Sequence, residues 1–338
     1  MDTLNRDRAP FPGEVWQMID EAAASAARDQ LTARRYLDLE GPFGVGLTTI
    51  EVGNDDYCRQ PGPEEAGAVM GRAIPLPMLR KSFQLSIRRV SAYVMNGQPL
   101  DLSPAQDAAE AVANREEEMI YSGQPAMGLA GLLTIEGHQR VPGSDWAAPD
   151  HALQDVLAAA TQLDNSGYRG PYALALAPAL YNNLFRLFPG SDVMALEHLR
   201  RLCTAGIYKA PIPGGVLVDT RAGVLVLGQD LQAGYSSQDG VHYQLYVSES
   251  IVLRVDEPVA VVRPRDRRHG QVVPAMHPGI QRRRVDQPVK PVEPGVEQDQ
   301  RAEKGQDAAG NTAERPEAPA ELGIEPVPGA EHRRDREE

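Results

Sequence analysis

Side chains that could hold a metal ion are scattered along this chain. The seven histidines stand at positions 138, 151, 198, 242, 269, 277 and 332, and no Glu-x-x-His, His-Glu-x-x-His or Cys-x-x-Cys sequence occurs. Those spacings bring the ligands of di-iron and zinc sites together. Asp239 and His242 are three residues apart, but they flank an expected turn. The sequence therefore predicts no metal site.

Groups that could act as nucleophiles or cradle a phosphate also lack the necessary pattern. The segment Gly234-Tyr235-Ser236-Ser237-Gln238 departs from the nucleophile elbow Gly-x-Ser-x-Gly at its last position. Cys203 closes an amphipathic segment, where a cysteine is usually a small buried hydrophobic residue. The glycines of residues 41–46 have the wrong spacing for a dinucleotide fold, and no Gly-Lys-Ser/Thr occurs. We therefore expect no catalytic residue, no cofactor and no enzyme activity.

Three consecutive glutamates, Glu116, Glu117 and Glu118, lie in an expected helix. Consecutive helical side chains point in different directions, so these carboxylates cannot converge on one ion. We expect them to form a solvated or salt-bridged face.

The elements that carry these residues predict an α+β fold with its strands concentrated late in the chain. Predicted helices cover residues 14–35, 103–122, 151–164, 178–188 and 193–203. Predicted strands cover residues 74–79, 82–90, 171–177, 216–218, 224–227, 241–247 and 251–262. The helix at 103 has the clearest start, because Ser103 and Gln106 match a capping box and Pro104 suits the first helical position.

A polar stretch rich in proline and glycine, residues 53–71, separates the first extended segment from the next strands. A loop of that length inside a domain is either functional or disordered. The first helix is also set off from the N-terminus, by Pro10 and Pro12. Such elements can reach neighbouring molecules. Without a credible active site, they indicate a structural or assembly role.

Charge and composition divide the 338 residues near Pro264. Residues 264–338 contain 13 basic and 15 acidic side chains, and no aromatic residue follows Tyr246, so the first 263 residues carry −11 of the formal charge of −13. A segment without aromatic residues cannot bury enough apolar surface to offset the entropy of ordering it. We expect a core built from about 260 residues and a disordered tail rich in proline and charge.

The same features exclude several classes of protein. No apolar run approaches the roughly 20 residues that span a bilayer, and the first residues lack the apolar region of a signal peptide. Two cysteines, Cys58 and Cys203, cannot make a disulfide framework. An acidic body disfavours general binding of nucleic acid. We expect a cytoplasmic protein with no membrane or specific nucleic-acid partner.

Several segments, taken in their order and spacing, resemble the encapsulins, which are bacterial and archaeal shell proteins. The resemblance runs from about Leu4 to Val262. The segments are Leu4-Asn5-Arg6-Asp7-Arg8-Ala9-Pro10, the R-x-x-x-D-x-x-G-P-x-G pattern from Arg34 to Gly44, Gly128-Leu129-Ala130-Gly131-Leu132-Leu133, Gly170-Pro171-Tyr172, and Leu227-Gly228-Gln229-Asp230-Leu231-Gln232-Ala233-Gly234-Tyr235.

The resemblance implies the Hong Kong 97-type major capsid fold. It divides the chain into an N-terminal helix and arm (1–44), an extended loop (45–75), a peripheral domain in two parts (76–125 and 221–263), an axial domain (126–220) and the tail (264–338). The spine helix of the peripheral domain would be residues 103–122. The tail would lie on the outer surface of the shell.

The resemblance also implies partners. The chain would assemble with itself into an icosahedral shell of sixty copies or a larger multiple, with pores for small ions and molecules. A ferritin-like iron oxidase or a dye-decolourising peroxidase would be captured inside through a peptide at its terminus, which links the shell to iron storage or oxidative stress. The alternative is a prophage major capsid protein of the same fold.

Two sets of residues acquire expected roles from the resemblance. The cargo peptide would bind at Leu31, Arg34, Asp38, Asp230 and Leu231, although an intrachain salt bridge between Arg34 and Asp38 is an equally good reading. The five-fold pore loop would be Phe188-Pro189-Gly190-Ser191-Asp192. Some family members stack a flavin on a tryptophan in the strand matching residues 85–90; this chain has Arg88 there, so we expect no flavin.

Overall fold

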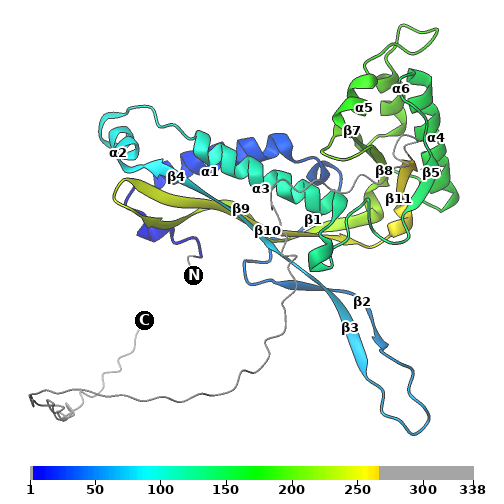
Figure 1. Ribbon diagram of the computed structural model, residues 1–338, viewed down its shortest axis with the longest axis horizontal. Coiled ribbons are helices and arrows are strands. Elements are labelled where there is room, and N and C mark those ends of the chain that lie inside the picture. Colours follow the sequence, from blue (N-terminus) through cyan, green and yellow to red (C-terminus); the bar gives the residue numbers. More distant parts are fainter. Residues whose placement is uncertain (1–2, 266–338) are drawn as a thin grey trace, which may run out of the picture. The chain divides into compact units, whose positions relative to one another are not determined.

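The computed structural model describes residues 3–265 (Figure 1). The predicted tail therefore lies outside the described residues, except for Pro264 and Arg265. The helices are α1 (Gly13–Gln30), α2 (Ile87–Asn96), α3 (Ser103–Ser122), α4 (Pro149–Asn165), α5 (Pro178–Asn183) and α6 (Ala195–Leu202). The strands are β1 (Asp38–Glu40), β2 (Thr49–Tyr57), β3 (Val69–Pro75), β4 (Met78–Ser86), β5 (Gln139–Pro142), β6 (Tyr172–Leu176), β7 (Gly206–Lys209), β8 (Gly215–Asp219), β9 (Gly223–Gln238), β10 (His242–Val255) and β11 (Val261–Arg265).

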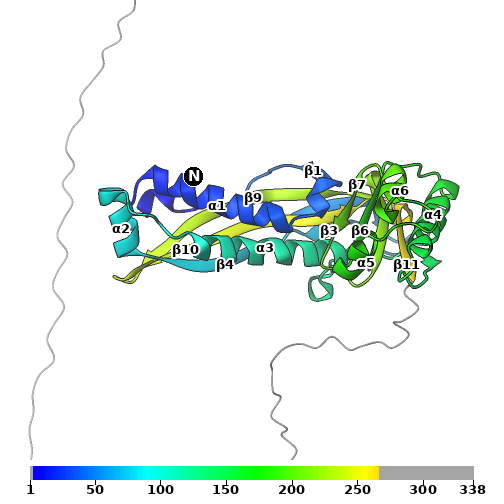
Figure 2. The ribbon, with the colours of Figure 1, turned by 90° about the horizontal axis from the view of Figure 1, so that it is seen from above.

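One sheet, in the order β1-β9-β10-β4, supports the helices α1 and α3. These helices run side by side along one face of the sheet (Figure 2). Phe83 of β4 and Leu245 of β10 are paired in the register of the sheet, and both are buried. Alternation along β4 therefore turns its apolar side chains toward the helices.

The first helix is shorter than predicted, because α1 ends at Gln30 and Leu31 is extended. A separate 3₁₀ turn covers Ala33–Arg35. The backbone N–H groups of Thr32 and Ala33 donate to the carboxylate of Glu117 instead of to helix carbonyls. This side chain from α3 diverts the chain out of the helix, so Arg34 lies in a tight turn and not at a helix end.

The helix α3 has the predicted span but not the predicted cap. Ser103 is its first residue, and Leu102 occupies the N-cap position without a side-chain hydrogen bond. The carboxylate of Asp101 accepts from the N–H of Ser103 at 2.9 Å and so satisfies a backbone donor at the start of the helix, the role expected of the capping box. At the other end Gly123 has a φ of 75°, a conformation that favours glycine.

The polar stretch forms the outer part of an arm: its ends lie in two strands, and residues 58–68 between them form an irregular loop. Strands β2 and β3 form a two-stranded antiparallel sheet, and nearly all their side chains are exposed. The arm projects away from the larger sheet (Figure 1). A two-stranded hairpin is marginally stable by itself, so its exposed surface suits contact with another molecule.

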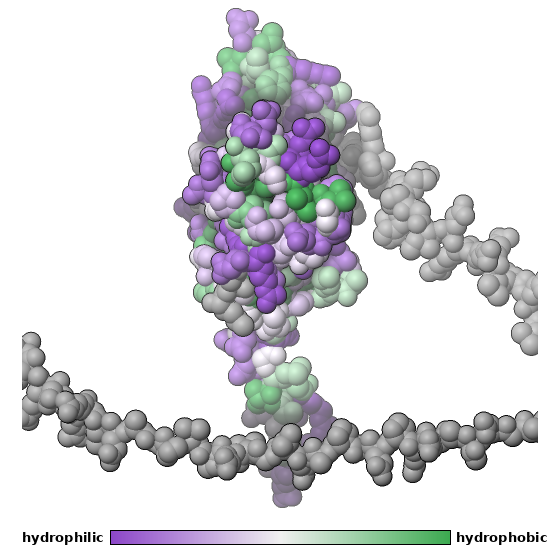
Figure 3. All heavy atoms as spheres, turned by 90° about the vertical axis from the view of Figure 1, so that its left-hand side faces the viewer, coloured by the Kyte–Doolittle hydropathy of each residue, from purple (hydrophilic) through white to green (hydrophobic). Residues whose placement is uncertain are grey.

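The strand predicted for residues 82–90 ends at Ser86. Residues 87–90 begin α2, so Arg88 lies in a helix, and the comparison with a strand tryptophan does not hold. Gly97 closes α2 in the left-handed conformation. Val94 and Met95 of α2 are exposed, and Figure 3, which looks toward this end, shows small apolar patches divided by polar side chains.

A second sheet, in the order β5-β11-β8-β6-β7, carries α4 on β5, β8 and β11. Every residue of β6 is buried, as predicted for the strand at 171–177. The helices α5 and α6 are shorter than predicted and leave a longer connection between them. The described helices include none that is long and apolar enough to cross a membrane.

The late strands differ from the predicted ones in length and in where they divide: the strand predicted for residues 251–262 is split, with its first part in β10 and its last residues in β11. The segments 224–227 and 241–247 extend into β9 and β10, which form one long hairpin turning at Asp239 and Gly240. Polar residues inside the two strands form hydrogen bonds with each other across the hairpin. The backbone N–H of Gln229 donates to Oγ of Ser250 at 2.8 Å, and the side-chain amide of Gln229 donates to Ser248. This pairing explains why polar residues did not interrupt the strands.

Candidate functional site

A groove of about 340 Å³ lies where α1, the turn after it and β9 meet. Its lining residues are Ala24, Ala27, Arg28, Leu31, Arg34, Arg35, Asp230 and Leu231. The alanines and leucines give it an apolar floor, because small side chains of α1 leave space above the helix. Arginines and one aspartate supply charged groups at its edge. The composition fits an extended peptide with apolar and charged side chains.

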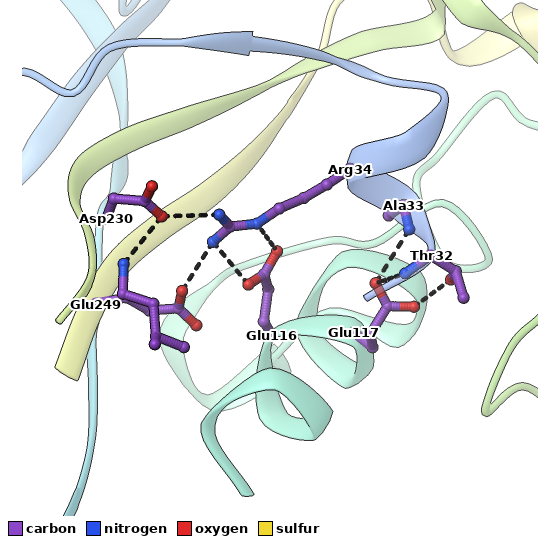
Figure 4. A network of polar contacts seen from close by, with 8 residues as sticks. Thr32, Ala33, Arg34, Glu116, Glu117, Asp230 and Glu249 are labelled. Carbon is purple, nitrogen blue, oxygen red and sulfur yellow. Dashed lines mark hydrogen bonds and ion pairs between the residues drawn. The ribbon is translucent and has the colours of Figure 1, made fainter. Parts of the chain in front are cut away.

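Arg34 joins three elements beneath this groove (Figure 4). Its guanidinium donates to both carboxylate oxygens of Glu116 in α3, at 2.7 and 2.8 Å. It also donates to Glu249 of β10 at 2.7 Å and to Asp230 of β9 at 2.8 Å. Burial lowers the pKa of Arg34, but the hydrogen bonds and charges of these acids outweigh burial and raise it. Arg34 is therefore always charged, and it forms four hydrogen bonds within the chain from its five N–H donors.

The acids around Arg34 differ in exposure. The side chains of Glu116 and Glu249 have no exposed surface, whereas that of Asp230 is 55% exposed. Among the described residues, no donor reaches one oxygen of Glu249, Oε1. Burial raises the pKa of Glu249 well above its ordinary value. The charge of Glu116, its carboxylate as an acceptor for the protonated form of Glu249, and the charge of Asp230 act in the same direction, and the charge of Arg34 opposes them. Only Asp230 can present its carboxylate to a ligand.

A second buried network fixes the turn that carries Arg34. Besides the backbone N–H groups of Thr32 and Ala33, Glu117 accepts from the hydroxyl of Thr32. That hydroxyl also bonds Tyr121, which accepts from Tyr36 at 2.9 Å. Burial raises the pKa of Glu117, and these hydrogen bonds oppose it. The turn is therefore held rigidly against α3.

Four of the five predicted peptide-binding residues line the groove: Leu31, Arg34, Asp230 and Leu231. Asp38 does not line it; this exposed residue lies in β1, opposite Val224. The alternative of a salt bridge between Arg34 and Asp38 is wrong, because Arg34 pairs within the chain with Glu116, Glu249 and Asp230. The role of these residues in binding stays a prediction.

The expectation of a solvated or salt-bridged face holds for Glu116, which pairs with Arg34, and for Glu118, but it is wrong for Glu117, which among the described residues bonds Thr32 and Ala33 and no cation. Glu116 and Glu117 are buried, and Glu118 alone is exposed, where it pairs with Arg115 at 2.5 Å. Sequence reasoning missed Glu116, Glu117 and Glu249 as supports of the site. The available signal was their position: two acids interrupt the apolar stripe of α3, and one interrupts a β-branched strand.

The predicted pore loop is an ordered turn. The N–H of Phe188 donates to the carbonyl of Val193 at 2.8 Å, and Ser191 donates to the carbonyl of Phe188 at 3.0 Å. Gly190 has a φ of 76°, and Asp192 is exposed. On either side the chain exposes four large apolar side chains: Phe185, Leu187, Val193 and Met194. The described residues do not test its place in a pore.

The residues singled out in the sequence as candidate metal ligands or nucleophiles do not meet as a group within residues 3–265. The described residues contain no group of three or more His, Cys, Asp or Glu that could hold a metal ion. His242 lies 3.9 Å from Asp239, whose carboxylate accepts from backbone N–H groups of its own turn. Cys203 is buried, and burial raises the pKa of its thiol to about 12.

Comparison with known proteins shows which family the sequence matches. Residues 1–252 match the family model described as "Encapsulating protein for peroxidase". The type 1 encapsulin shell protein EncA of Myxococcus xanthus is 32% identical over 276 residues, covering 77% of this chain and 95% of the relative.

Solved structures agree on the fold. The virus-like particle of Pyrococcus furiosus superposes with a TM-score of 0.59 at 23% identity, covering 75% of this chain and all of that one. The capsid of an empty GTA particle superposes with a TM-score of 0.50 at 16% identity, covering 69% and 90%. The expected Hong Kong 97-type capsid fold is confirmed.

Proposed function

The chain belongs to the encapsulin family of shell proteins, and on that premise we propose that it is the subunit of a closed icosahedral nanocompartment that captures a cargo enzyme. The observation that carries this proposal is the family match over three quarters of the chain, joined to a capsid fold with an exposed arm. Sixty copies, or a larger icosahedral multiple, would form the shell, because closed symmetry lets identical surfaces satisfy one another.

The segments take the roles that such a shell requires. The arm of β2 and β3 is the extended loop, whose edges would pair with a neighbouring subunit. The residues around α3 and the β9–β10 hairpin form the peripheral domain, and residues 126–220 form the axial domain. The ordered turn at residues 188–192, with the exposed apolar side chains beside it, would meet its symmetry mates around a five-fold pore.

The groove is the docking site for a peptide at the cargo's terminus. Apolar side chains of the peptide would cover Ala24 and Leu231, whose accessible surface supplies most of the binding energy when it is buried. Leu31 is already buried and shapes the floor of the groove. Asp230 would accept from a basic side chain or a backbone N–H, and Arg28, which is exposed at the edge, would bind a carboxylate. Arg34 contributes by holding Asp230 in place, because four of its five N–H donors are engaged within the chain.

The chemistry of the compartment would belong to the cargo. A ferritin-like iron oxidase or a dye-decolourising peroxidase in the cytoplasm would supply the activity, and the shell would supply confinement and pores. A prophage capsid protein of the same fold is the weaker alternative, because the family model and the curated relative both describe encapsulating shell proteins.

Assembly is tested by size-exclusion chromatography and negative-stain electron microscopy of the full chain at physiological salt. We expect uniform closed particles. A monomer or dimer under these conditions would contradict the proposal.

Cargo docking is tested by filling the groove without changing charge. Ala24 lines the groove and is exposed on α1, and its neighbour Ser25 is equally exposed but lies outside the groove. We expect Ala24→Gln to leave the shells intact and lower the cargo-to-shell ratio of particles purified from the producing cells several-fold, with Ser25→Gln as the matched control. An unchanged ratio in both variants would show that the peptide binds elsewhere.

A further inference from the structure

A second cavity, of about 460 Å³, lies next to the groove, and Arg35 lines both. Its walls come from the end of α1 and the turn after it, from Asn114 of α3, from Tyr181 of α5, and from β7 with the residues that follow it. Volumes of 300 to 1,000 Å³ with apolar walls and a few polar groups are typical of small-molecule sites. The proposed shell function makes no use of this cavity.

Two cations face this cavity without a carboxylate partner. Among the described residues, the one hydrogen bond of the Arg35 guanidinium goes to the carbonyl oxygen of Arg28, at 2.9 Å. The ammonium group of Lys209 lies 5.2 Å from the centre of the Tyr181 ring and forms no ion pair within residues 3–265. Asp29 is the single carboxylate among the lining residues, so one positive charge is in excess. The cavity therefore attracts anions.

Aromatic rings form part of the walls. Tyr208 is stacked on the buried Tyr36, with ring centres 5.6 Å apart and planes 25° apart, and its hydroxyl donates to the carbonyl of Ala205. Both ends of Tyr208 are thus fixed, and Tyr181 is held between Lys209 and Phe185. Fixed rings offer flat apolar surface at little entropic cost. The amide of Asn114, which is exposed, adds a donor and an acceptor.

We propose that this cavity binds a small anion carrying a flat aromatic ring, of the nucleoside monophosphate class, with Arg35 and Lys209 on the anionic group and Tyr181, Tyr208 and Asn114 against the ring. Charge-assisted hydrogen bonds from two cations give the site its affinity for the anion. The ring walls distinguish such a ligand from inorganic phosphate. This site is separate from the peptide groove, although Arg35 lines both.

The test is isothermal titration calorimetry of the full chain, in the state in which it purifies, with adenosine monophosphate. We expect saturable binding that Lys209→Met weakens about tenfold, the loss of one charge-assisted contact. Lys81→Met is the matched control, because Lys81 is an exposed lysine of β4 that lies outside the cavity. Inorganic phosphate and adenosine should each bind more weakly than the monophosphate.

Asp29→Asn distinguishes a ligand contact from a structural effect, because it changes affinity in the opposite direction. Removing the one carboxylate should tighten binding about threefold, since like charges repel at short range. No binding of the monophosphate, or equal affinity in the wild type and in Lys209→Met, would overturn the proposal. Binding that Lys209→Met and Lys81→Met weaken equally would overturn it as well. Because Lys209 lies outside the peptide groove, cargo loading in Lys209→Met should be unchanged whatever the outcome.

Discussion

Replacing Glu249 with glutamine should stabilise the folded protein at neutral and alkaline pH. The carboxylate is completely buried, no donor among the described residues reaches one of its oxygens, and Glu116 and Asp230 add negative charge beside it. A buried polar group left unsatisfied costs about 1 to 3 kcal/mol. Glutamine keeps the acceptor for Arg34, removes the buried charge, and puts an N–H donor at the position of the unpartnered oxygen, beside the carboxylate of Glu116. We therefore expect Glu249→Gln to raise the free energy of unfolding by about 1 to 3 kcal/mol at pH 8.

The raised pKa of Glu249 makes the stability of the wild type depend on pH. Because burial raises the pKa of Glu249, the folded protein keeps this proton at pH values where the unfolded chain, titrating near about 4.3, has lost it. The stability contributed by Glu249 is therefore complete below that value and declines as the pH rises through the raised pKa. In Glu249→Gln this decline is absent. The gap between variant and wild type should widen from pH 5 to pH 8.

The assay is guanidinium unfolding followed by tryptophan fluorescence at one fixed subunit concentration, because the stability of an oligomer depends on concentration. Glu116→Gln is the matched control, with the same chemical change at a carboxylate whose two oxygens are both bonded by Arg34. It should destabilise the protein by about 1.5 to 3 kcal/mol, the range for a hydrogen bond to a charged group. The reasoning would be refuted if Glu249→Gln destabilised the protein at pH 8, or if both variants changed the free energy of unfolding in the same direction.

Three further substitutions test the supports of the fold by chemical denaturation. Thr32→Val removes the hydroxyl that donates to the buried Glu117 and should cost about 1 to 3 kcal/mol, whereas a cost near zero would mean that the backbone N–H groups suffice. Gly123→Ala places a Cβ 2.4 Å from a backbone oxygen at a φ of 75°, so we expect at least about 1 to 3 kcal/mol of destabilisation and a lower yield of particles. Asp155→Ala leaves the buried Trp146 indole without its acceptor at 2.8 Å and should cost about 1 to 3 kcal/mol, seen also as a shift in tryptophan emission.

Periodic and capped segments were predictable because their signals are local. The span of α3, the buried strand β6 and the position of α4 follow from apolar spacing, a proline at the helix start and turn residues at the ends. The early end of α1 was not predictable, because its cause is a carboxylate 85 residues away, in Glu117. The length of β9 and β10 was not predictable either, because the polar residues inside each strand form hydrogen bonds with residues of the other strand, which are distant in the sequence.

The sequence by itself determined the α+β class, the division near Pro264, the acidic body and, through ordered motifs, the resemblance to the encapsulins. Through that resemblance it also identified four residues that line the groove, Leu31, Arg34, Asp230 and Leu231, although the first two precede the last two by 196 or more residues. Only the tertiary structure decided that Arg34 is bound to Glu116, Glu249 and Asp230 and that Asp38 is not its partner. Sequence spacing limits which neighbours a side chain can reach along one element, whereas burial and charge pairing are set by elements that meet only after the chain has folded.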